Sequence, residues 1–126
     1  VTTKQARLLL IGLGVWLVLS VAQYFNNYYP YTNEFVGHKE NAWKYVGAGN
    51  LNFTQAEWLL DDYLQKHPGI QRAPEQPGTG KFVLVIDSYL DIWNTGKYKW
   101  LRKLNPIGQV HYSYLLFNVQ QKDIEP

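Results

Sequence analysis

The three histidines are the side chains best suited to bind a metal ion, because the sequence contains no cysteine. They are His38, His67 and His111. No two of them have the short spacing of a metal-binding pair, and no Asp or Glu lies at a supporting offset. We therefore expect no metal site and no bound cofactor. His67 fits better as the last residue of a helix, where it complements the helix dipole, and His111 fits better as a strand residue.

Two pairs of carboxylates could in principle do acid–base chemistry. Glu57 and Asp61 are four residues apart on one expected helix, and Asp87 and Asp91 flank the end of an expected strand. A solvated helix face, with Glu57 as part of a helix cap, explains the first pair better than catalysis does. The second pair has no evident partner. We expect no catalytic residue, and therefore no enzyme activity, in this chain.

An uncharged apolar segment occupies residues 8–25, with only Ser20 and Gln23 polar. As a helix it would be roughly 27 Å long, which is near the thickness of a bilayer's hydrocarbon core. Lys4 and Arg7 precede it, and the next charge is Glu34. The positive-inside rule then predicts a cytoplasmic stub and transmembrane helix at residues 1–25 of an inner (cytoplasmic) membrane protein. Residues 26–126 would form a periplasmic, extracytoplasmic domain.

A cleavable signal peptide is the competing interpretation of the same segment. Lys4 and Arg7 would form its basic region, residues 8–19 its apolar region, and Ser20, Val21 and Ala22 its small-residue cleavage site. We favour the anchor and keep the signal peptide as an alternative. A buried core helix is a third, weaker possibility.

Aromatic residues are abundant, with 5 Trp, 10 Tyr and 5 Phe, and they gather around the end of the apolar segment. Trp and Tyr favour lipid headgroups and protein interfaces. We expect the residues at the membrane interface or in contact with a partner to be Trp16, Tyr24, Phe25, Tyr28, Tyr29 and Tyr31. The expected partners are the lipid bilayer and other membrane protein subunits. Nucleic acid is not expected, because the net charge is only +2 and the basic residues are scattered.

The domain is expected to be α+β or small α/β, with its elements in the order helix, strand, helix, strand. Thr54 and Glu57 have the spacing of a capping box for a helix over residues 55–66, which Pro68 ends. Strands are predicted over 81–87 and 109–119, adjacent in one sheet. The remaining expectations are one or two helical turns at 41–46, a short extended piece at 50–53, a loop at 71–80 and helical spacing at 98–104.

Several segments in order resemble the C-terminal tail of protein O-mannosyltransferase-like membrane glycosyltransferases, which use lipid-linked sugars. These segments are 30–37 (PYTNEFVG), 41–46 (NAWKYV), 50–55 (NLNFTQ), 98–101 (YKWL) and the stretch from 106 to 114. The resemblance implies a last membrane helix followed by an extracytoplasmic domain, and it covers nearly the whole chain. Asn52 and Phe53-Thr54 depart from the aspartate and Trp-Gly of the family pattern. That family's catalytic acid lies in its first extracytoplasmic loop, so no catalytic residue carries over.

Two functions from different classes follow. The favoured one is a stand-alone, non-catalytic accessory subunit that docks on a larger membrane complex through its helix and its aromatic domain. The alternative is the terminal part of a full glycosyltransferase, where the domain would help to bind substrate. A secreted soluble module, released by cleavage at Ala22, is kept as a third interpretation.

Overall fold

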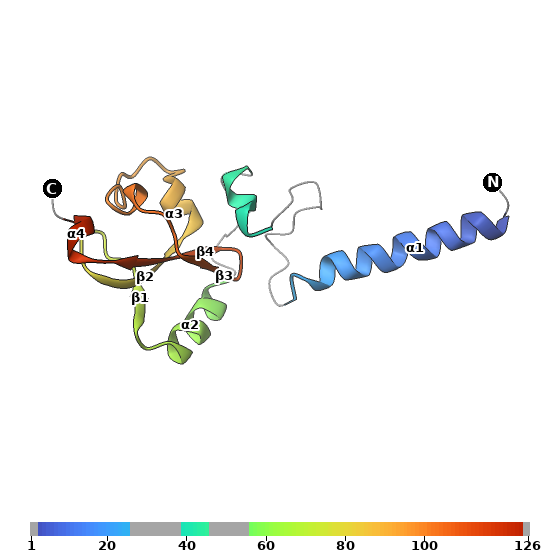
Figure 1. The fold of residues 1–126 in the computed structure, drawn as a ribbon, viewed down its shortest axis with the longest axis horizontal. Helices are drawn as coiled ribbons and strands as arrows, with labels where there is room; N and C mark the ends of the chain where they lie inside the picture. Colours follow the sequence, from blue (N-terminus) through green and yellow to red (C-terminus); the bar gives the residue numbers. More distant parts are fainter. Residues whose placement is uncertain (1–2, 26–38, 46–55, 125–126) are drawn as a thin grey trace.

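A long N-terminal helix and a small α+β domain make up the computed structural model, which describes residues 3–25, 39–45 and 56–124. The domain is built around a four-stranded mixed sheet. Figure 1 shows α1 extending away from the domain, with α4 at the opposite end of the molecule. The α+β expectation is therefore confirmed.

Helix α1 (Thr3–Ala22) contains 20 residues and, from Leu8 to Leu19, is apolar on every side. A helix of this kind has no polar face to turn toward water. Its last turn tightens through hydrogen bonds from the Tyr24 amide to Val21 O (3.0 Å) and from the Phe25 amide to Ala22 O (3.2 Å). The helix thus ends within three residues of the point where the apolar segment ends in the sequence.

The sheet has the strand order β1-β2-β4-β3, with β1 parallel to β2 and the other neighbours antiparallel. Its strands are β1 (Ile70–Arg72), β2 (Gly80–Val85), β3 (Gly108–Val110) and β4 (Tyr114–Val119). The two strands predicted from sequence are β2 and β4, and their predicted adjacency is confirmed. They pair along their full length, from Gly80 opposite Val119 to Val85 opposite Tyr114.

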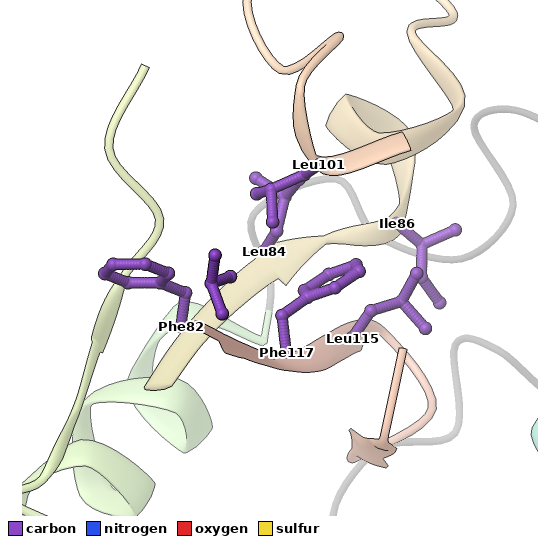
Figure 2. Close-up of a cluster of buried hydrophobic side chains, with 7 residues drawn as sticks. Phe82, Leu84, Ile86, Leu101, Leu115 and Phe117 are labelled. Atoms are coloured by element: carbon purple, nitrogen blue, oxygen red, sulfur yellow. The ribbon is translucent and has the colours of Figure 1, made fainter. Parts of the chain in front are cut away.

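One face of the β2–β4 pair carries the larger apolar core, shown in Figure 2. Successive side chains of a strand point to opposite faces, so alternate residues of both strands reach this side. They meet α3 (Ile86–Leu90) and the 3-10 helix η3 (Leu101–Lys103), which lie over this face. The buried members of the cluster are Phe82, Leu84, Ile86, Leu101, Leu115, Phe117 and Val119.

The opposite face of the sheet is covered by α2 (Glu57–Lys66), which lies on the other side of the sheet from α3 in Figure 1. Val83, Val110 and Tyr114 pack there against Leu59 and Leu60 of the helix. Tyr63 and Leu64 join the cluster in partly buried positions, so the predicted apolar stripe of this helix is confirmed. Burial on both faces explains why the central strands appear in the sequence as continuous apolar runs.

The start of α2 differs from the predicted capping box. The helix begins at Glu57, and Ala56 occupies the N-cap position without a side-chain cap. Thr54 lies outside the described residues. Glu57 does not serve as a cap here, because its carboxylate contacts Arg72 and Tyr114 instead. The predicted end is confirmed, since His67 is the C-cap and its amide donates to Leu64 O at 3.2 Å.

Other predicted boundaries also shift. The strand predicted over 81–87 ends at Val85, where the chain enters α3 directly. The strand predicted over 109–119 is interrupted by a turn at 111–113, so the expectation that His111 is a strand residue is wrong. The helical spacing at 98–104 yields only the short η3, and the first residues of the predicted loop at 71–80 belong to β1. Side-chain spacing alone did not reveal these breaks, because the apolar pattern continues through them.

Two short elements complete the described domain. The 3-10 helix η2 (Lys39–Lys44) matches the one or two turns expected at 41–46. Helix α4 (Gln121–Ile124) follows β4, and the Asp123 carboxylate accepts a hydrogen bond from the Gln120 amide at 2.9 Å. The extended piece predicted at 50–53 lies outside the described residues.

We predict that Phe117→Ala destabilises the domain by about 3–5 kcal/mol, because it removes a ring that is 1% exposed and leaves a cavity between the sheet and η3. Asn118→Ala, on the exposed neighbouring position of the same strand, should change the free energy of unfolding by less than about 0.5 kcal/mol. Urea unfolding of the full chain in detergent, followed by tryptophan fluorescence, measures both. Equal effects of the two substitutions would contradict the burial pattern.

Candidate functional site

Among the described residues, the side chains of α1 form the largest apolar surface that the rest of the chain does not cover. Its large side chains from Leu8 to Leu19 are each at least 50% exposed, and of the helix's residues Ser20 alone is buried. The helix is long enough to cross a membrane, with a mean hydropathy of 1.8, and 6% of its most apolar window is buried. A continuous apolar surface of this size requires lipid or protein around it.

The predicted interface residues fall into three groups. Trp16 is 51% exposed and Phe25 is 73% exposed. Tyr24, by contrast, is only 1% exposed, because it is packed inside the chain. Tyr28, Tyr29 and Tyr31 lie outside the described residues.

The Tyr24 ring rests against Tyr112, with 5.2 Å between ring centroids and 48° between the ring planes. This contact joins the end of α1 to the turn between β3 and β4. It was not expected from the sequence, where the two residues are far apart and both lie in aromatic-rich stretches. Tyr24 is therefore part of the contact between α1 and the domain.

The β3–β4 turn has an unusual backbone for its residue types. His111 and Tyr112 have φ values of 48° and 59°, and the Ser113 amide donates to Val110 O at 3.2 Å. Three residues join β3 to β4, because Val110 pairs with Tyr114. Two successive positive φ values at the central positions of a four-residue turn are typical of type I′, which strongly favours Asn and Gly. A non-glycine residue in the left-handed region costs on the order of 1 kcal/mol. Because neither residue is Asn or Gly, the sequence contains no signal for this turn.

The His111 side chain lies near the exposed charges of α2. Burial lowers the pKa of His111; the charge of Asp62 acts to raise it and that of Lys66 acts to lower it. The His111 imidazole therefore binds a proton less tightly than an exposed histidine does. Moving a neutral imidazole from water to apolar surroundings costs less free energy than moving an imidazolium.

The Glu57–Asp61 pair is held by an arginine that the sequence analysis did not connect with it. Arg72 Nη2 lies 2.9 Å from Glu57 Oε2 and 2.9 Å from Asp61 Oδ1. The Tyr114 hydroxyl donates to Glu57 Oε1 at 3.3 Å. These contacts fasten strand β1 and the sheet to α2. The expected solvated face is therefore partly an ion-pair network.

Asp91 is the most constrained carboxylate among the described residues, and the expectation that it lacks a partner is wrong. It adopts φ 55° at the end of α3, and its side chain is 7% exposed. Its Oδ1 accepts from the Thr95 amide at 2.7 Å, and its Oδ2 accepts from the Gly96 amide at 3.1 Å. Arg102 Nη2 lies 2.6 Å from Oδ2. The Thr95 hydroxyl also donates to Oδ1, at 3.0 Å. The Arg102 guanidinium, followed by the amide donors and this hydroxyl, lowers the pKa of Asp91 to about 2. Asp87 is buried in the first turn of α3.

A groove of about 460 Å³ lies between η2 and β3. Trp43, Glu40 and Lys44 form one wall, and Ile107 with Gly108 lies on the other. An indole ring, a carboxylate and an amine line the same space. This mixture favours no single class of ligand.

No group of three or more His, Cys, Asp or Glu side chains within residues 3–25, 39–45 and 56–124 is placed to hold a metal ion. His38 lies outside these ranges. His67 caps α2 as expected, with Nδ1 2.8 Å from Tyr63 O and its ring stacked on the Tyr63 ring.

Comparison of the chain with protein-family models, with curated proteins and with solved structures finds no match. The resemblance to glycosyltransferase tails stays a prediction that rests on the segments quoted above.

We predict that Asp91→Asn lowers the urea midpoint of unfolding at pH 7. The pKa of Asp91 in the folded chain, about 2, lies below its ordinary value of 3.8, so the carboxylate stabilises the fold above pH 3.8. This contribution is lost as the pH falls through about 2. The difference between wild type and variant should therefore shrink between pH 4 and pH 2, measured by urea titration at each pH.

Asp62→Asn is the matched control, since this exposed carboxylate pairs only across one helical turn with Lys66 at 2.7 Å. Its effect at pH 7 should stay below about 0.5 kcal/mol. If Asp91→Asn were equally mild, the network around Asp91 would not stabilise the 91–96 loop.

Proposed function

We propose that this chain is a single-pass membrane protein whose exported domain serves as a non-catalytic accessory subunit of a larger membrane complex. The observation that carries the proposal is the uncovered apolar surface of α1. A helix of 20 residues is roughly 30 Å long, which is the thickness of the hydrocarbon core. A bilayer would cover this surface on all sides.

The charges at the two ends of α1 support an orientation with the N-terminus in the cytoplasm. Lys4 and Arg7 lie in its first two turns, and its last turn carries no basic residue. The positive-inside rule assigns the basic end to the cytoplasmic side. The domain would then lie on the extracytoplasmic side of the cytoplasmic membrane.

Two features of the domain favour a docking role. Its charged clusters at Arg72 and Asp91 are used to connect helices, strands and loops of the same chain. Several large apolar or aromatic side chains are instead exposed, including Tyr45 (76%), Trp93 (73%) and Trp58 (59%). Exposed Trp and Tyr are enriched where proteins bind one another.

We predict that the chain stays with membranes after washing at alkaline pH, because α1 is embedded. Leu13→Arg combined with Leu17→Arg should release it, since each arginine at the centre of a span costs about 2.5–3.5 kcal/mol. Lys4→Arg is the control, because it keeps the charge outside the apolar segment. Release of the wild-type chain would contradict anchoring, and a mature chain that begins at Gln23 by mass spectrometry would establish a cleaved signal peptide.

We predict that mild detergent extraction from native membranes recovers the 14.7 kDa chain in a larger complex at fixed stoichiometry. Replacing Phe25, Tyr28, Tyr29 and Tyr31 with Ser should weaken that association, because in the sequence these aromatic residues lie at or just after the end of the apolar segment. Tyr63→Ser, which removes a half-buried ring stacked on His67 of α2, is the control for loss of an aromatic ring elsewhere. Recovery only as part of a much larger polypeptide with many spans would instead support the glycosyltransferase tail.

A further inference from the structure

The end of α1 and the β3–β4 turn are in contact through one pair of aromatic rings. Tyr24 is 1% exposed, and its ring centroid is 5.2 Å from that of Tyr112. Only one residue, Gln23, separates Tyr24 from the last residue of α1. There is consequently no long linker between the apolar helix and this contact.

The depth of Tyr24 in a bilayer follows from the length of the apolar segment. If Lys4 and Arg7 mark the cytoplasmic boundary, the segment of residues 8–25 spans roughly 27 Å, and its last residues reach the opposite boundary. The headgroup layer on each side is roughly 5–8 Å thick. A ring 5.2 Å from Tyr24 therefore falls within or directly beside that layer.

The chemistry of the turn suits this position. Tyr rings combine an apolar body with a hydroxyl and are enriched among lipid headgroups. Because His111 and Tyr112 have left-handed φ values, the chain turns at these residues instead of continuing as one strand. The turn forms the end of the β3–β4 hairpin. Strained conformations of this kind persist where surrounding contacts hold them, and Tyr24 supplies such a contact.

We propose that the tip of the β3–β4 hairpin, His111 and Tyr112, is a membrane-facing surface that rests in the outer headgroup layer beside α1. This inference rests on the proposed membrane anchoring of α1. The opposite end of the sheet, where α4 lies, then points away from the bilayer (Figure 1). The domain would thus be seated on the membrane in one orientation.

The absence of cysteine in the sequence allows single labels to be placed without background. Nitroxide labels are attached to the full chain at Val15→Cys, His111→Cys, Ile107→Cys and Lys122→Cys. Each variant is reconstituted in nanodiscs of phosphatidylcholine and phosphatidylglycerol. Collision with oxygen and with a water-soluble nickel chelate reports the depth of each label. The label at 107 serves as a second probe in case His111→Cys disturbs the turn. Ile107 is 65% exposed, so its replacement leaves the core intact.

We expect the ratio of oxygen collisions to nickel-chelate collisions to be highest for the label at position 15, intermediate at 111, lower at 107 and lowest at 122. Tyr112→Ser in the 107-labelled chain should move that label toward the values of bulk water. Tyr63→Ser, which removes a ring stacked on His67 of α2, should leave it unchanged.

Two other outcomes are separable. If the label at position 15 reports hydrocarbon while the labels at 111, 107 and 122 all report bulk water, α1 is anchored but the hairpin does not touch the membrane. This outcome overturns the inference. If 15 also reports water, the proposed anchoring fails, and the inference fails with it.

Discussion

The antiparallel pairing of β2 with β4 determines the rest of the domain. Residues 82–85 and 114–117 of these strands pack on both faces, so each belongs to one of two cores according to its parity. Phe82 faces the core under η3, whereas Val83 faces α2. A shift of register by one residue would exchange these two environments. The positions of α2 and α3 therefore depend on one set of strand hydrogen bonds.

The sequence was informative where a pattern had one physical cause. The uninterrupted apolar segment predicted α1, the stripe of Leu59, Leu60 and Tyr63 predicted the buried face of α2, and the β-branched runs predicted the central strands. It was uninformative where tertiary contacts decide the backbone. The turn at His111 and Tyr112 contains neither Gly nor Asn, and Ile86 continues an apolar run although it begins a helix.

The candidate site was predicted in part for the same reason. Composition and position predicted Trp16, Tyr24 and Phe25 as interface residues; Trp16 and Phe25 are exposed, and their role at an interface stays a prediction. Composition could not reveal that Tyr24 would be buried and in contact with Tyr112, because that contact joins segments distant in sequence. The partners of Asp91 were missed similarly, since Arg102 reaches it only after the chain has folded back over the sheet.

The strand order also affects when the domain can fold. The last strand in the sequence, β4, lies between β2 and β3, so neither has its full set of neighbours until residues 114–119 are available. If the domain is exported behind α1, beginning with the residues next to the helix, this strand is delivered late. Until then the apolar faces of α2 and β2 would lack their partners. Such a chain would remain open to holding chaperones throughout its passage, and it would close into a native sheet only near the end of export.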